Sequence, residues 1–248
     1  MYSLLLKIFC IILPFITAFN VEAKKEIALY IYFDKPPFIV DQKNKVGLSY
    51  DFSAALNRYS SIHKYSIIQT PKPRILNEKD VGNAVLWTNP AWVKDINMDK
   101  YDWILNLIPE QELYITHDKN LTYKNQSSLH NKKIATVRSY RYFNLEKLFN
   151  EGLAIRTNVH NERAVALMLV YKRADLGVVG LQTFEYFKRT IPEVRNNLNI
   201  LSGYKESFQR GILINKSNPE IKHDIQGWLN SEEGKAEWQA IKNKWLLH

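Results

Sequence analysis

Short β-prone runs alternate with helix-like runs along most of this chain, and they do so in two successive series. In the first series, residues 26–33 are nearly all apolar, as expected of a strand buried on both faces. Phe52, Ala55, Leu56 and Tyr59 then recur at helical spacing. Further strand-like runs of this series cover residues 65–69, 83–87 and 112–116.

The second series begins near Lys132. One of its predicted helices, residues 161–172, places apolar side chains on one face, namely Ala164, Leu167, Met168 and Tyr171. The other segments predicted in this series are strands at 133–137, 153–157 and 175–179 and a helix at 142–151. Two βαβ series in succession predict two α/β lobes.

The last part of the chain predicts a return to the first lobe. A strand-like run at 208–214 precedes two predicted helices, 219–230 and 232–245. The chain then crosses between the lobes twice. A double crossing forms a hinge, and a cleft between hinged lobes is a common ligand site.

The amino terminus has the pattern of a signal peptide. Lys7 precedes an apolar run from Ile8 to Phe19, and small residues stand before a cleavage point after Ala23. The alternative is an uncleaved membrane anchor. The only cysteine, Cys10, lies inside this segment, so the secreted chain has no disulfide and no thiol nucleophile.

The formal net charge is +9. Such an excess is compatible with nucleic acid, anionic lipid or an anionic ligand. The lysines and arginines are scattered along the chain, however, which indicates a solvated surface. We therefore expect no nucleic-acid partner.

Several segments occur in an order that matches a known family. Residues 34–38 read Asp-Lys-Pro-Pro-Phe after the first strand, and 47–52 read Gly-Leu-Ser-Tyr-Asp-Phe at the start of a helix. Residues 173–178 read Arg-Ala-Asp-Leu-Gly-Val before a strand, and 233–245 form the last helix. In order and spacing, these segments resemble the amino-acid-type periplasmic solute-binding proteins, family 3 of the extracellular solute-binding class.

This resemblance implies the two-lobed, type II periplasmic-binding-protein-like α/β fold with two crossings between lobes. The boundaries that we expect are 1–23 for the signal peptide, 24–114 for lobe I, 115–203 for lobe II and 204–248 for the return to lobe I.

The positions with which the family binds an amino acid are changed. Its carboxylate-binding arginine follows the third strand, but residues 87–95 contain no arginine. Its ammonium-binding acid, five positions after Asp175, falls on Gly180. A standard α-amino acid is therefore not the expected ligand.

Other cleft residues suggest a different ligand. Trp87 and Trp92 flank a turn at the end of a predicted strand, where aromatic faces suit a sugar, a heterocycle or a cation. Either ring can instead pack beneath the loop. The remaining candidates are Asp34 and Phe38 on the first cleft loop and Arg138, Tyr140 and Arg141 before a predicted helix. Arginines at a helix start favour an anion, but they can also be surface residues whose stems cover apolar area.

The function that these features predict is binding of a small polar or anionic solute by hinge closure, with delivery to an inner-membrane transporter or receptor. We expect a periplasmic monomer with no cofactor and no enzyme activity. One alternative is a two-lobed sensing or interaction protein that has lost small-molecule binding. A cleft enzyme such as a dehydratase, using Glu110 and Glu112, is a further alternative.

Overall fold

The computed structural model of the chain describes residues 23–77, 83–138 and 140–246. The predicted signal peptide lies outside the described residues except for Ala23. Within the described ranges, no helix has both the length and the apolarity needed to span a bilayer.

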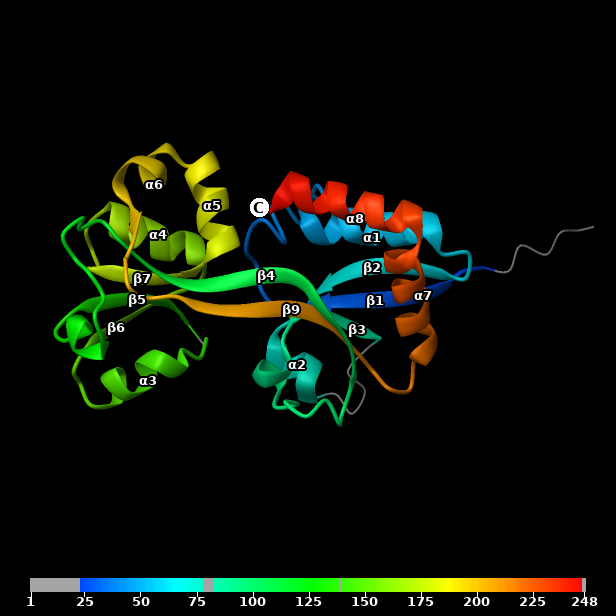
Figure 1. The fold of residues 1–248 in the computed structure, drawn as a ribbon, viewed down its shortest axis with the longest axis horizontal. Coiled ribbons are helices and arrows are strands. Elements are labelled where there is room, and N and C mark those ends of the chain that lie inside the picture. Colours follow the sequence, from blue (N-terminus) through cyan, green and yellow to red (C-terminus); the bar gives the residue numbers. More distant parts are fainter. Residues whose placement is uncertain (1–22, 78–82, 139, 247–248) are drawn as a thin grey trace, which may run out of the picture.

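Two lobes share one sheet, whose strands follow the order β2-β1-β3-β9-β4-β7-β5-β6, with β8 also paired to β4 (Figure 1). In each lobe three strands are parallel, namely β2-β1-β3 and β7-β5-β6, and the antiparallel strands β9 and β4 lie between these groups. This arrangement confirms the predicted α/β fold with two lobes and two crossings.

Lobe I contains the first and last elements of the chain. Its strands are β1 (Lys25–Ile31), β2 (His63–Gln69) and β3 (Ala84–Thr88), and its helices are α1 (Leu48–Tyr59), α2 (Lys72–Asn77), α7 (Pro219–Asn230) and α8 (Glu232–Trp245). Helices α1 and α8 cover one face of the sheet and α2 the other (Figure 1). The two final helices have the bounds expected from the sequence.

Lobe II is formed by the middle of the chain. Its strands are β5 (Lys133–Val137), β6 (Ile155–Val159), β7 (Leu176–Gly180) and β8 (Asn199–Ile200), and its helices are α3 (Phe143–Asn150), α4 (Glu162–Val170), α5 (Leu181–Thr190) and α6 (Pro192–Asn197). Helices α4, α5 and α6 lie on one side of the sheet and α3 on the other (Figure 1).

The crossing strands are β4 (Asp102–Thr116) and β9 (Glu206–Ile214), which run side by side through both lobes (Figure 1). The sequence predicted only the last five residues of β4. Its earlier part contains a register shift between Ile104 and Ile108, with Asn106 at φ 58°, and then Pro109. Such features weaken the pattern of a strand without preventing it from pairing.

Helix α4 corrects one expected detail. Its buried residues are Glu162, Val165, Ala166 and Leu169, so the face that packs on the sheet is not the one expected from Ala164, Leu167, Met168 and Tyr171. Both faces of this helix carry apolar residues. Because the buried face also carries a glutamate, the sequence pattern favoured the other face. That glutamate belongs to the site described next.

Candidate functional site

The lobes meet where the loop after β1 contacts the starts of α4 and α5. The Lys35 Nζ atom lies 2.7 Å from Glu162 Oε1, and both side chains are only 6% exposed. On the adjoining residue, the Pro36 carbonyl accepts a hydrogen bond of 2.7 Å from the Thr183 hydroxyl. A further contact joins the ends of α5 and α8, because Arg189 donates to the Trp245 carbonyl at 3.1 Å. The lobes are therefore closed on one another.

Glu162 is the first residue of α4 and binds groups on both sides of the interface. While Oε1 contacts Lys35, Oε2 accepts a hydrogen bond of 3.1 Å from the Gly180 backbone N–H. An acidic side chain in the first turn is also favoured by the positive end of the helix dipole. The carboxylate is thus held in place by lobe II and presented to lobe I.

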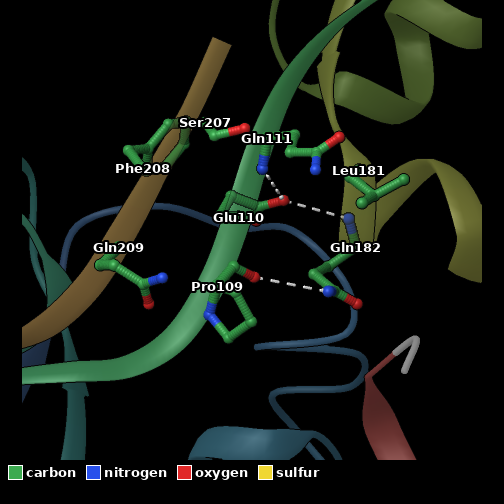
Figure 2. A pocket seen from close by; sticks show the side chains of 8 residues that line it. All are labelled: Pro109, Glu110, Gln111, Leu181, Gln182, Ser207, Phe208 and Gln209. Carbon is green, nitrogen blue, oxygen red and sulfur yellow. Dashed lines mark hydrogen bonds between the residues drawn. The ribbon is translucent and has the colours of Figure 1, made fainter. Parts of the chain in front are cut away.

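A second buried ion pair joins the crossing strands. Arg210 on β9 donates through Nε to Glu110 Oε2 at 3.3 Å and through Nη1 to the Trp87 carbonyl at 3.0 Å. Glu110 on β4 is fully buried, and Arg210 is 5% exposed. Figure 2 shows that the Glu110 carboxylate also accepts from the Gln182 N–H, at 3.1 Å, in the first turn of α5. This carboxylate therefore caps α5 and binds the guanidinium at the same time.

Aromatic rings surround the Arg210 guanidinium, whose central carbon lies 4.9–5.4 Å from four ring centroids. The rings are those of Trp92, Phe38, Phe208 and Phe33. A cation over aromatic faces is stabilised by the ring quadrupoles, and more strongly when water is excluded.

The two ion pairs converge on Gly180. A Cβ atom at that position would lie 3.3 Å from both Glu110 Oε2 and Lys35 Nζ. We call the four charged residues Lys35, Glu110, Glu162 and Arg210 the buried quartet. Gly180 is the position at which the resembled family has its ammonium-binding acid, so here the carboxylates reach the same place from β4 and α4.

A carboxyl group with a raised pKa, that of Glu112, lies beside the quartet. Burial raises the pKa of Glu112 to about 7, and the charges of Glu206 and Glu162 act in the same direction. A hydrogen bond of 3.0 Å from the Tyr204 hydroxyl and the charge of Lys35 partly oppose this rise in pKa. Counted with the quartet, the Glu112 carboxyl gives this region three carboxyl groups and two cations.

Four of the seven residues predicted from the sequence lie in this region or directly beside it. Phe38 and Trp92 contact the Arg210 guanidinium, as described above. Tyr140 packs against the cores of both lobes, and burial together with the nearby Glu162 raises its pKa. Asp34 is exposed and precedes Lys35 on the same loop.

The other three predicted residues lie elsewhere. Trp87 is fully buried in lobe I, where Nε1 donates to the Ser49 hydroxyl at 2.8 Å, and only its carbonyl reaches the quartet. Arg141 pairs with Glu146 at 2.8 Å and remains 63% exposed. Arg138 is exposed as well. No anion site formed by the two arginines together is visible in the described structure.

The members of the quartet were not selected from the sequence, apart from Glu110 as a residue of the enzyme alternative. Two signals could have found others. Glu162 lies on the same helical face as Val165, Ala166 and Leu169, and Arg210 directly precedes the apolar run 211–214 at the buried end of its strand. A charged residue within an apolar pattern is expected to be buried and therefore to need a partner of opposite charge, so it is a candidate for a buried ion pair.

An open hollow of about 570 Å³ adjoins the quartet along the crossing strands (Figure 2). Its lining residues are Pro109, Glu110, Gln111, Leu181, Gln182, Ser207, Phe208 and Gln209. A second hollow, of about 400 Å³, continues from it past Gln111 and Leu181. Among the described residues, no group of three or more His, Cys, Asp or Glu side chains is placed to hold a metal ion.

Solved structures of similar fold cover most of this chain. An ancestral arginine-binding protein bound to arginine is 16% identical, with a TM-score of 0.71 over 90% of this chain and 98% of its own. A mutant of the arginine-binding protein of T. maritima is 18% identical, with a TM-score of 0.68 over 89% and 94%. A histidine kinase sensor domain with similarity to periplasmic binding proteins is 15% identical, with a TM-score of 0.68 over 90% and 96%.

No family model matches the sequence, and no curated protein does. The fold is that of the two-lobed periplasmic binding proteins, as the sequence resemblance implied. At these identities the likeness establishes the fold alone.

Proposed function

We propose that this chain is a two-lobed receptor that closes about β4 and β9 on a small polar solute. The observation that carries the proposal is the buried ion pair between Lys35 of lobe I and Glu162 of lobe II. Apolar residues of the same size would hold two lobes together at least as well as a buried ion pair. Charges at such an interface are better suited to a contact that must open and to the recognition of a polar group.

A cationic solute is the first candidate. Carboxyl groups outnumber cations at the interface, and the Glu112 carboxyl, whose pKa is raised mainly by burial, forms no ion pair among the described residues. An ammonium or guanidinium group would supply the missing charge. The similar structures include arginine-binding proteins with arginine bound and one with glutamine bound. An anionic solute, as expected from Arg138 and Arg141, is the second candidate.

A sensing role is the alternative for the whole protein. It is supported by the similar sensor domain of a histidine kinase and by the pairing of the cleft charges with one another. In that case a partner protein would recognise and bind the closed conformation. For either role we propose a secreted, monomeric protein in the periplasm, in agreement with the signal-peptide pattern of residues 1–23.

Thermal unfolding of residues 24–248 against a panel of solutes tests the proposal. The panel contains arginine, lysine, polyamines, dicarboxylates, phosphate esters and sugars. A solute present at about one hundred times its dissociation constant adds about 2.7 kcal/mol, which corresponds to a rise in midpoint of about 5–10 °C for a chain of this size. Turnover of each solute that binds is followed by NMR, because one similar protein is described as a precursor of cyclohexadienyl dehydratase.

The control variants are two Glu→Gln substitutions in lobe II. Glu162→Gln removes a buried carboxylate of the interface, whereas Glu151→Gln changes a side chain that is 49% exposed. A solute that binds in the cleft must lose affinity in the first variant and keep it in the second. If no solute moves the midpoint of the wild type, the receptor proposal fails and the sensing role becomes the better one.

A further inference from the structure

Lys35 binds a site that is formed almost entirely outside its own lobe. Its ammonium group contacts Glu162 of α4 at 2.7 Å and lies beside Gly180 and the Glu110 carboxylate. Within lobe I, the Lys35 ammonium group contacts the Phe33 ring, whose centroid lies 5.6 Å from Nζ. The geometry is that of a cation bound by lobe II and the crossing strands.

The backbone next to Lys35 is held as firmly as its side chain. The Lys35 carbonyl accepts from the Ile39 N–H at 3.0 Å, which closes a turn of the loop. The Pro36 carbonyl accepts from Thr183 at the start of α5. Lobe II thus binds this lysine by the ammonium group and by the adjoining backbone.

Exposed lysine pairs of the same length give a comparison. Lys64 lies 2.7 Å from Glu26, but both side chains are more than 60% exposed. Such a pair survives any movement between lobes, because both partners belong to adjacent strands of lobe I. The Lys35 pair is broken whenever the lobes separate, and its burial depends on their closure.

We propose that Lys35 is an internal ligand of the interlobe site, where its ammonium group occupies a subsite that accepts a primary ammonium. Because this concerns the same site, it deepens the proposed function. The lobes close on Lys35 without a solute, and a solute ammonium must displace it. If Lys35 fills the subsite for about 90% of the time, the apparent affinity for a free ammonium falls about tenfold.

The test removes the internal ligand and supplies it from solution. In Lys35→Ala the missing atoms are three methylene groups and the ammonium, which together correspond to n-propylammonium. We expect n-propylammonium to raise the unfolding midpoint of this variant by several degrees, with saturation, at concentrations at least about tenfold below those that affect the wild type.

Three controls make the result specific. 1-Propanol has the same chain without the charge and should leave the midpoint of Lys35→Ala unchanged. The variant Lys64→Ala removes an exposed lysine and should gain no response to n-propylammonium. The double variant Lys35→Ala/Glu162→Gln should lose the response of Lys35→Ala. An equal response of Lys35→Ala and Lys64→Ala would overturn the inference.

A second variant covers the case in which Lys35→Ala does not fold. Lys35→Met keeps most of the volume of the side chain and removes its charge. We expect a larger radius of gyration than that of the wild type by small-angle X-ray scattering, because the lobes lose the contact that closes them. An unchanged radius in folded Lys35→Met would also overturn the inference.

The outcomes separate this inference from the proposed function. If n-propylammonium acts on Lys35→Ala and no solute in the panel acts on the wild type, the internal ligand stands and the receptor proposal fails. If solutes raise the midpoint of the wild type but n-propylammonium does not raise that of Lys35→Ala, the receptor proposal stands and the internal ligand is refuted.

Discussion

Arg210→Met is expected to destabilise the protein strongly, although it replaces a charged residue with an apolar one of similar length. The substitution leaves the Glu110 carboxylate fully buried without its cation, and it leaves the Trp87 carbonyl without its donor. Removal of one partner of a buried ion pair costs about 3–5 kcal/mol. Glu110 keeps its hydrogen bonds from Gln111 and Gln182, so we expect the lower half of that range.

The assay is urea unfolding followed by tryptophan fluorescence and circular dichroism, since agreement between the two probes tests for a single transition. A loss of 3 kcal/mol lowers the thermal midpoint by about 6–12 °C in a chain of this size. Lys64→Met, which breaks an exposed ion pair, serves as the control and should cost less than about 1 kcal/mol.

The double variant Arg210→Met/Glu110→Gln tests the cause. Once the buried carboxylate is neutral, at least about 2 kcal/mol of the loss should return, because the uncompensated charge is gone. A cost below about 1 kcal/mol for Arg210→Met would refute the reasoning. So would a double variant that is less stable than the single one.

The remaining predictions concern a titrating group, a core residue and a surface residue. The pKa of Glu112 is raised from 4.5 in an unfolded chain to about 7, so its neutral form stabilises the folded state fully below pH 4.5, and this contribution is lost as the pH rises through 7. Glu112→Gln should remove up to about 3 kcal/mol of that pH dependence, as measured by urea unfolding between pH 4.5 and 8. Trp87→Ala should cost about 3–5 kcal/mol, because the ring is fully buried and stacks 5.9 Å from Trp238, and thermal unfolding would measure it. Arg141→Ala should change neither the unfolding midpoint nor the affinity for any solute of the panel. A loss of affinity for anions in this variant would instead support the anion site that the sequence predicted.

Much of the fold could be predicted from the sequence because buried parallel strands and amphipathic helices have strong patterns. Strand β5 and helices α7 and α8 have the expected bounds. Strand β4 was predicted in part because Pro109 and a register shift interrupt it, and its pairing with β9 compensates. Helices α5 and α6 were not assigned, although Leu181, Phe184 and Phe187 of α5 recur at helical spacing.

The site was less predictable because it is formed by residues far apart in the chain. Loop residues such as Phe38 and Trp92 could be selected from their position after a strand. The ion pair between Lys35 and Glu162 spans 127 positions, and no local pattern indicates that the two charges meet. Trp87 and Arg141 have the residue types of a binding site, but their surroundings give them partners of other kinds.

The connection of the lobes by β4 and β9 also determines the order in which the protein can be built during synthesis. The hydrophobic core clusters of lobe II draw their buried residues from the continuous segment 113–201. The core of lobe I runs from Ile27 to Leu246 and includes Trp238 and Trp245 of the last helix. As the chain emerges from its amino-terminal end, the core residues of lobe II are therefore complete while lobe I still lacks α7 and α8, and the first strand must wait for these helices.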